Sequence, residues 1–207
     1  RYTVIYNSKP VTSLLRTSKS KPVRFIISSR PAVGKGHEHL IKAFQNLLKR
    51  GYAEFKCDIY GEGPLNKHLA EIISESGLAD KIQLKGFSRN LKEDLKQYDF
   101  GVLCSRDEGL PNTAIEYLSK ALPSLTTRAG ALPEIIRDGE NGYLHDYGDV
   151  QTLTEQLVRC MEMDDAAYST LSKEAHKTMA ETFNLESNVL ALETYFKDCL
   201  EKHRKGT

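Results

Sequence analysis

Short apolar runs alternate along this chain with longer stretches in which apolar residues recur every three or four positions. The short runs are rich in Val, Ile, Phe and Leu, which predicts buried strands. They cover Val23–Ser28, Phe55–Tyr60, Lys81–Gly86, Asp99–Cys104, Leu122–Thr127 and Gly142–His145. The longer stretches have the period of amphipathic helices, and Gly51 and Gly77 end the first two.

This alternation of strand and helix predicts an α/β fold, a Rossmann-like parallel sheet with right-handed crossovers and helices on both faces. From Asp149 the pattern is helical to the end, so we expect a helical C-terminal extension. We divide the chain into a linker segment (1–22), a Rossmann-like domain (23–183) and a C-terminal helix (184–207). Within the linker, Val4–Asn7 predicts a short strand and the Ser-, Thr-, Lys- and Pro-rich remainder predicts loop.

Composition and charge narrow the class of protein. The chain has 207 residues, is 40% hydrophobic and 28% charged, and has a net charge of +1, which gives no indication of nucleic-acid binding. No apolar run reaches the length of a membrane span and no signal-peptide pattern is visible, so we expect a cytoplasmic location. The cysteines are widely spaced, and Cys57 and Cys104 lie in predicted strands, which favours buried free thiols over metal or disulfide roles.

The segment from Glu108 to Glu116 contains the most specific chemistry. Glu108 follows a predicted strand, glycine and proline then force a turn, and Asn112–Ala121 predicts a helix with Asn112 as its N-cap. Glu108 is therefore expected on a loop at the carboxyl edge of the sheet, with Glu116 about one helical turn further on. Carboxylates hold hydroxyl groups and free N–H groups at a helix start attract anions, so the segment suits a ligand that is part phosphate and part sugar.

Two cations, Arg30 and Lys35, follow the first predicted strand. At the carboxyl end of a strand they can neutralise a diphosphate and the growing charge of a leaving group, although solvated surface charges are the alternative. Gly36 rather than Ser or Thr follows Lys35, so this loop is not a P-loop. His37 and His39 are two positions apart and point to different faces of a helix, so a shared zinc ion is not expected.

Together these segments resemble the donor-site motifs of the GT4 family of retaining glycosyltransferases, which have the two-domain GT-B fold. The matching segments and family patterns, in order, are 30–37 (G-R-L … K-G-H), 61–64 (G-[DE]-G-P), 86–87 (F-L-G), 108–116 (E-x7-E) and 130–142 (G-G-x-P-E … D-G-x-N-G). The resemblance covers about residues 23–145. Within the E-x7-E segment, the sequence E-G-L-P-N is similar to that of bacterial surface-polysaccharide enzymes. The chain departs from the pattern at Ala121 and Ala129, where the family has glycine.

The resemblance implies one half of a GT-B enzyme that transfers a sugar from a nucleoside-diphosphate sugar to an acceptor, in polysaccharide or glycolipid biosynthesis. It implies Arg30 and Lys35 on the diphosphate, Glu108 on hydroxyls of the transferred sugar and Glu116 on the ribose hydroxyls. The other substrate-binding candidates are positions that a ligand can approach closely: Gly61, Gly63, Gly86, Phe87, Gly109, Leu110 and Asn112. At Gly86 and Phe87 two interpretations stay open, main-chain contacts to the nucleotide base or a simple strand end with a core-facing Phe87.

The resemblance also implies a missing N-terminal acceptor domain, through which any peripheral contact with the inner face of the membrane would be made. No D-x-D pair is present, so we expect donor binding without a metal cofactor. Two other functions remain possible from the sequence. A GT-B nucleotide-sugar epimerase would need an acid/base pair, and Glu108 alone is a candidate. The other is a non-catalytic nucleotide-sugar-binding module whose site is vestigial, and the intact Arg30, Lys35, Glu108 and Glu116 argue against such decay.

Overall fold

A computed structural model describes residues 4–11 and 15–205. Its centre is a six-stranded sheet in which every neighbouring pair is parallel, in the order β3-β2-β1-β4-β5-β6. The strands are β1 Val23–Ser28, β2 Phe55–Tyr60, β3 Ile82–Gly86, β4 Phe100–Leu103, β5 Ser124–Thr127 and β6 Gly142–His145. The strand order reverses between β1 and β4, so the loops that follow these strands leave the sheet in opposite directions.

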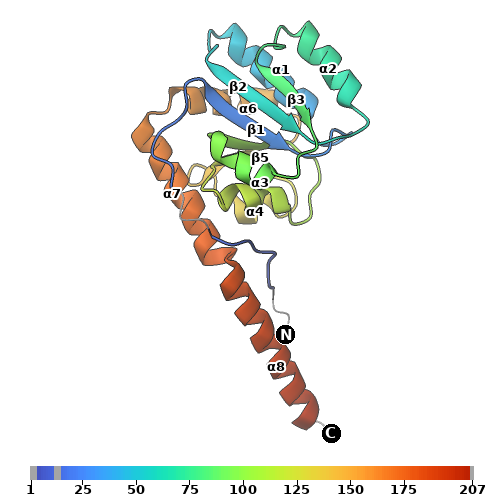
Figure 1. Cartoon of the computed structure of the whole chain (residues 1–207), viewed down its shortest axis with the longest axis vertical. Coiled ribbons are helices and arrows are strands. Elements are labelled where there is room, and N and C mark those ends of the chain that lie inside the picture. Colours follow the sequence, from blue (N-terminus) through green and yellow to red (C-terminus); the bar gives the residue numbers. More distant parts are fainter. Residues whose placement is uncertain (1–3, 12–14, 206–207) are drawn as a thin grey trace.

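Helices cover both faces of the sheet, as the α/β prediction requires (Figure 1). They are α1 His37–Lys49, α2 Asn66–Glu75, α3 Leu91–Asp94, α4 Asn112–Leu118, α5 Leu132–Ile135, α6 Val150–Glu162, α7 Asp165–Thr182 and α8 Leu185–Lys205, with a 3-10 turn η1 Leu95–Gln97. One apolar core joins the sheet to α1, α2 and α6, and a second joins it to α4, α5 and α7. Within β1, Phe25 and Ile27 belong to the first core and Ile26 to the second, which is the alternation of a strand buried on both sides.

Several predicted boundaries are corrected by the structure. β3, β4 and β5 are shorter at their ends than predicted. α7 begins at Asp165, where the Asp164 carboxylate accepts a hydrogen bond from the Ala167 N–H (2.7 Å). α4 ends at Leu118 rather than at Ala121. Ala121 has a φ of 52°, a left-handed conformation in which the chain turns back toward β5. A glycine would adopt this conformation at no steric cost.

The predicted strand at Val4–Asn7 is wrong. These residues do not join the sheet; the segment 4–11 lies against the corner between α7 and α8, where Lys9 forms an isolated bridge with Asn184. A strand needs a neighbouring strand to satisfy its backbone groups, and here that partner is a turn between helices. Further along the predicted linker, Arg16 is buried and donates to the carbonyls of Leu95, Tyr98 and Lys120.

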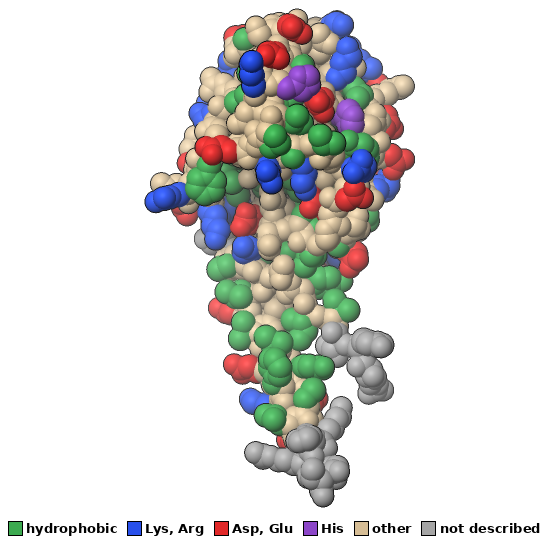
Figure 2. Space-filling model, turned by 90° about the vertical axis from the view of Figure 1, so that its right-hand side faces the viewer, with side chains coloured by type: hydrophobic (Ala, Val, Ile, Leu, Met, Phe, Trp, Pro, Cys, Tyr) green, Lys and Arg blue, Asp and Glu red, His purple; other side chains and the backbone are tan. Residues whose placement is uncertain are grey.

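α8 extends well beyond the sheet (Figure 1), and apolar side chains are exposed along its length (Figure 2). These side chains are Leu185, Val189, Leu190, Leu192, Tyr195, Phe196 and Leu200. Charged residues interrupt the apolar positions, and no helix within 4–11 and 15–205 is apolar over a length that would cross a membrane.

Tyr117 of α4 fills the place where β1 and β4 separate. The register of β1 against β4 ends at Ile27 and Val102, and the next N–H, that of Ser28, donates to the Tyr117 hydroxyl (2.8 Å). The Tyr117 side chain is completely buried, and burial raises its pKa, so the hydroxyl stays neutral. A Cβ at Gly101 would lie 2.3 Å from the ring, so only glycine leaves room for it. One side chain on α4 thus fixes the end of β1.

We expect Tyr117→Phe to lower the free energy of unfolding by about 1–3 kcal/mol, because the buried Ser28 N–H loses its acceptor while the ring packing is kept. Urea denaturation followed by circular dichroism measures the change. Tyr52→Phe is the matched control, since the Tyr52 hydroxyl donates to Glu162 at an exposed position and its loss can be replaced by water. Equal effects of the two substitutions would contradict this role of Tyr117.

Candidate functional site

The loops after β1 and β4 meet at the carboxyl edge of the sheet. The N–H of Arg106 donates to the carbonyl of Gly34 (2.7 Å), and Lys35 Nζ lies 2.6 Å from Glu108 Oε1. The side chains are 31% exposed in Lys35 and 16% exposed in Glu108. The structure therefore brings together two predicted site residues that are 73 positions apart in the sequence. They neutralise each other across the point where the strand order reverses.

Close backbone packing makes this approach possible. Gly36 has a φ of 69°, and a Cβ at this position would lie 2.1 Å from the carbonyl oxygen of Cys104 at the end of β4. The next residue, His37, is buried, and its Nε2 lies 3.1 Å from the Ser29 Oγ. Burial lowers the pKa of His37 to about 4, so its ring is neutral near pH 7 and adds no charge beside Lys35.

Glu116 is likewise paired with a lysine. Its Oε1 lies 3.0 Å from Lys9 Nζ, and both side chains are partly buried. Lys9 was missed by the sequence interpretation, which treated the segment before the first strand as linker. The only signal was a single positive charge in a Lys-rich stretch, and nothing local distinguishes that lysine from its neighbours.

The prediction that Asn112 caps its helix is wrong. Pro111 precedes the helix in an extended conformation (ψ 108°), and Asn112 is the first helical residue, with no side-chain bond to the helix start. Its Oδ1 accepts a hydrogen bond from Asn7 Nδ2 (3.4 Å) instead. Proline is well suited to the position before Asn112 because its fixed φ orients the chain into the helix. With seven residues, α4 has a weaker dipole than the longer helix that the sequence predicted.

Arg30 does not join the Lys35–Glu108 pair. It is exposed and lines a shallow hollow of about 300 Å³ with Ser29, Gly61, Glu62 and Phe87. Phe87 is 70% exposed, so the alternative in which it faces the core is wrong. Its ring remains available at the edge of this hollow.

The glycines after β2 are required by protein packing itself. A Cβ at Gly61 would lie 2.4 Å from the Ser29 carbonyl oxygen, and one at Gly63 would lie 2.2 Å from that of Pro31. Gly61 also donates its N–H to the carbonyl of Gly86 (2.8 Å), and Gly86 has a φ of 67°. These close approaches hold the loops after β1, β2 and β3 at one level along the edge of the sheet.

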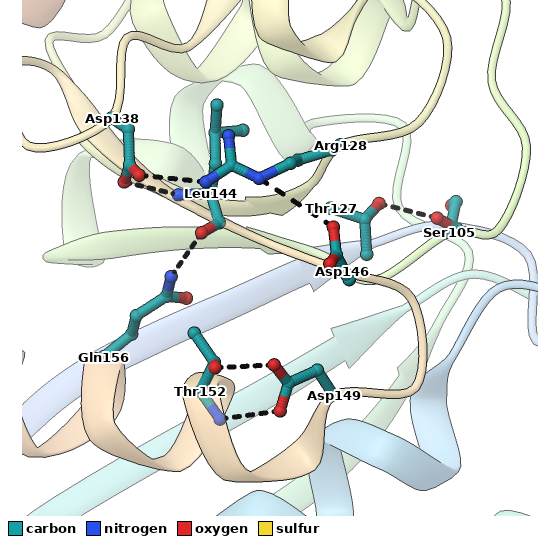
Figure 3. Close-up of polar contacts among 9 residues, drawn as sticks. All are labelled: Ser105, Thr127, Arg128, Asp138, Leu144, Asp146, Asp149, Thr152 and Gln156. Carbon is teal, nitrogen blue, oxygen red and sulfur yellow. Dashed lines mark hydrogen bonds and ion pairs between the residues drawn. The ribbon is translucent and has the colours of Figure 1, made fainter.

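The loop after β5 packs against the backbone of the loop that contains Glu108. Gly130 has a φ of 52°, and a Cβ there would lie 1.7 Å from the Glu108 carbonyl oxygen. The Thr127 hydroxyl donates to the carbonyl of Ser105 (2.6 Å), which ties the end of β5 to the end of β4 (Figure 3). Gly130 lies in one of the motifs found in the sequence, whereas nothing in the sequence distinguished Thr127 as a residue that positions the Glu108 loop.

A further cation, Arg128, follows β5 but is already engaged. Its guanidinium lies 3.1 Å from Asp138 and 3.8 Å from Asp146, and Asp138 also accepts from the Leu144 N–H (2.9 Å; Figure 3). The guanidinium thus braces the loops on either side of β6. Among the described residues, no group of three His, Cys, Asp or Glu side chains is placed to hold a metal ion.

The cysteines are free, as predicted. Cys57, Cys104 and Cys160 are buried, and burial raises the pKa of Cys104 to about 12, which keeps its thiol protonated and inert beside the site.

The geometry can be compared with known proteins. The profile of the family described as "Glycosyl transferases group 1" matches residues 22–163, which include both loops of the Lys35–Glu108 pair. The chain belongs to this family. The predicted motif resemblance is therefore confirmed, and with it the expectation of a Rossmann-like GT-B half.

Two curated relatives are enzymes whose names include a glycosyl group. The chain is 24% identical over 205 residues to the N-acetyl-alpha-D-glucosaminyl L-malate synthase of Bacillus anthracis, a match that covers 98% of this chain and 53% of the relative. It is 27% identical to the poly(glycerol-phosphate) alpha-glucosyltransferase of Bacillus subtilis, over 85% of this chain and 26% of that protein. The chain thus spans about half of one relative's length and less of the other's.

Solved structures of glycosyltransferases contain the same fold as this chain. The pneumococcal O-GlcNAc transferase GtfA, in complex with UDP and GlcNAc, superimposes with a TM-score of 0.80 at 26% identity, over 92% of this chain and 38% of that one. The C-terminal domain of the glycosyl transferase group 1 family protein LpcC from Francisella tularensis has a TM-score of 0.72 at 25% identity, over 79% of this chain and 87% of that one. This fold has therefore been observed as a separate domain.

Two glycine substitutions distinguish the effect of the Gly130–Glu108 contact on stability from the effect of backbone strain. We expect Gly130→Ala to lower the free energy of unfolding by about 1–3 kcal/mol more than Gly139→Ala, because the added methyl group forces the Glu108 loop to move. Gly139 is the matched control: its φ is 79°, so alanine is strained there too, but nothing lies within 4 Å of the added Cβ. Chemical denaturation of both variants measures the difference, and equal losses would mean that the Gly130 loop does not support Glu108.

Proposed function

We propose that this chain is the donor-binding part of a retaining glycosyltransferase that transfers a sugar from a nucleoside-diphosphate sugar to an acceptor. The observation that supports it best is the Lys35–Glu108 pair at the edge between β1 and β4, in a chain of the glycosyl transferases group 1 family. In open α/β sheets, ligands bind at the carboxyl edge where the strand order reverses. The pair there offers a cation for phosphate and a carboxylate for hydroxyl groups.

In this proposal Lys35 and Arg30 bind the diphosphate and stabilise it as a leaving group. Lys35 exchanges Glu108 for a phosphate oxygen, an exchange that costs little because an ion pair that is partly exposed to water is only weakly stabilising. Arg30 is exposed at the adjoining hollow and can add a two-pronged contact. Protein cations then balance the negative charge that grows on the departing diphosphate.

The two glutamates bind different parts of the donor. Glu108, released by Lys35, accepts hydrogen bonds from hydroxyls of the transferred sugar, with main-chain groups of Gly109 and Leu110 beside it. Glu116 accepts from the ribose hydroxyls, and Asn112 lies at the start of the same helix. The backbone at Gly61, Gly63 and Gly86 and the exposed Phe87 lie at the other end of the ligand, where the base would contact main-chain groups and the Phe87 ring.

The whole protein is proposed to contain an acceptor-binding domain in addition to residues 23–183. Segment 1–22 would lead from that domain, and α8, with its exposed apolar side chains, would offer it a surface. The names of the relatives favour a step of polysaccharide or glycolipid biosynthesis. We place this step in the cytoplasm, with any contact to the inner membrane face made by the acceptor domain. The family match favours this function over an epimerase or a non-catalytic module.

The diphosphate contact is tested by calorimetric titration with a nucleoside diphosphate and with the matching nucleoside. We expect Arg30→Ala and Lys35→Ala each to weaken diphosphate binding by about ten- to a hundredfold, the effect of losing a charge-assisted hydrogen bond, and to leave nucleoside binding nearly unchanged. The loss should shrink as salt concentration rises. Lys42→Ala, on the exposed part of α1, is the control for loss of a positive charge. Equal losses for nucleoside and diphosphate would instead indicate a disturbed fold.

The glutamates are separated by titrating two variants with two ligands. Glu116→Ala should weaken the bare diphosphate and the diphosphate sugar alike, by roughly 1.5–3 kcal/mol, because both contain ribose. Glu108→Ala should bind the bare diphosphate at least as well as the unmodified chain, since it frees Lys35, and should bind only the sugar-bearing donor more weakly. If Glu108→Ala weakens the bare diphosphate as much as Glu116→Ala does, the sugar does not lie over Glu108.

A further inference from the structure

The segment 4–11 packs on the corner between α7 and α8, beside the site. The N–H of Lys9 donates to the carbonyl of Phe183 (3.1 Å), and the Lys9 carbonyl accepts from the N–H of Leu185 (3.2 Å), so hydrogen bonds fix its backbone on both sides. The Tyr6 ring packs on the Phe183 ring with centroids 5.4 Å apart, and the Tyr6 carbonyl accepts from Asn188 Nδ2 (3.2 Å). The corner between α7 and α8 thus serves as a platform for this segment.

From this platform three side chains reach the helices at the carboxyl edge of the sheet. The Tyr6 hydroxyl donates to Glu134 of α5 (2.6 Å), Asn7 donates to Asn112 of α4, and Lys9 pairs with Glu116 of α4. All three contacts end on α4 or α5, and the Lys9–Glu116 pair is the one between full charges. The segment is therefore linked to α4 and α5 by polar side-chain contacts.

The Lys9–Glu116 geometry leaves acceptor positions of the carboxylate unused. Among the described residues, Lys9 Nζ pairs with Oε1 of Glu116, at 3.0 Å. A carboxylate offers roughly four lone-pair positions on its two oxygens, so one lysine contact leaves acceptor positions for two hydroxyl donors. A lysine on a fixed backbone also limits the rotamers of Glu116 before any ligand binds, which lowers the entropy lost on binding.

We propose that Lys9 is a positioning residue of the nucleotide site: it orients the Glu116 carboxylate so that it accepts both hydroxyls of a ribose diol. The proposal rests on the proposed function, in which Glu116 binds ribose. Lys9 lies outside residues 22–163, the part that matches the family profile, so the site is completed by a side chain from the segment that precedes the domain. Because hydrogen bonds hold the Lys9 backbone on both sides, we favour a Lys9 that stays paired with Glu116 when the ligand binds over one that the ligand displaces.

The test uses the full chain and measures how strongly it discriminates the diol. Calorimetry with UDP, GDP, ADP and CDP, which all contain the ribose diol, first identifies the diphosphate that binds best. Its affinity is then compared with that of its 2′,3′-dideoxy form, and the ratio reports the contribution of the diol. Lys9→Met should lower this ratio by about two- to fivefold, the contribution of a partly exposed ion pair, without changing the affinity for the dideoxy form. Lys9→Arg should restore most of the ratio.

The controls separate this inference from the function on which it rests. Glu116→Ala should abolish the discrimination, while Lys42→Met, a lysine of α1 that bonds only Gln45 in its own helix, should leave it intact. If no diphosphate binds, or if Glu116→Ala keeps the full ratio, the ribose role of Glu116 is wrong and Lys9 has no diol to position. If Glu116→Ala acts as expected but Lys9→Met keeps the ratio, weakens both ligands equally or tightens binding of the diol, Lys9 is not a positioning residue.

Discussion

The separation of β1 from β4 is the constraint on which the site depends. A parallel sheet whose strand order reverses cannot keep these two strands paired to their ends, because their following loops leave in opposite directions. Tyr117 fills the resulting gap, and its hydroxyl accepts the first N–H that β4 no longer pairs. Gly101 is the counterpart in β4, because any side chain there would collide with the ring. The packing of Tyr117 between β1 and β4 therefore both separates the two strands at the carboxyl edge and fixes the end of β1.

Charge pairing keeps the opened edge assembled without a ligand. Glu108 and Glu116 would repel an anionic ligand if they were unpaired, and each has a lysine within hydrogen-bonding distance. The lysines come from different places: Lys35 from the loop after β1, and Lys9 from the segment before the domain. Ion pairs that are partly exposed to water are weak, so they can order side chains and still exchange partners at small cost.

Where sequence reasoning failed, a contact distant in sequence was responsible. Asn112 is of a residue type that often caps helices, but Pro111 already directs the chain into α4. The Asn112 side chain accepts a hydrogen bond from Asn7 instead. Val4–Asn7 has the composition of a strand, but the chain places it beside a helix corner instead of a sheet edge. For Phe87 the sequence left two interpretations open; β3 is an outer strand and ends before it, which leaves the ring exposed.

By itself, the sequence determined the features that depend on local pattern. The six strands, the order of strand and helix and the motifs at the strand ends follow from apolar periodicity and from glycines, whose conformational freedom is local. Only the tertiary structure decided which charges meet. Lys35 lies 73 positions from Glu108, and Lys9 lies farther still from Glu116. The distances within both pairs depend on the sheet order and on where the first segment packs. Coulomb attraction between partly exposed side chains is too weak to specify such partners, so the packed backbone must place them.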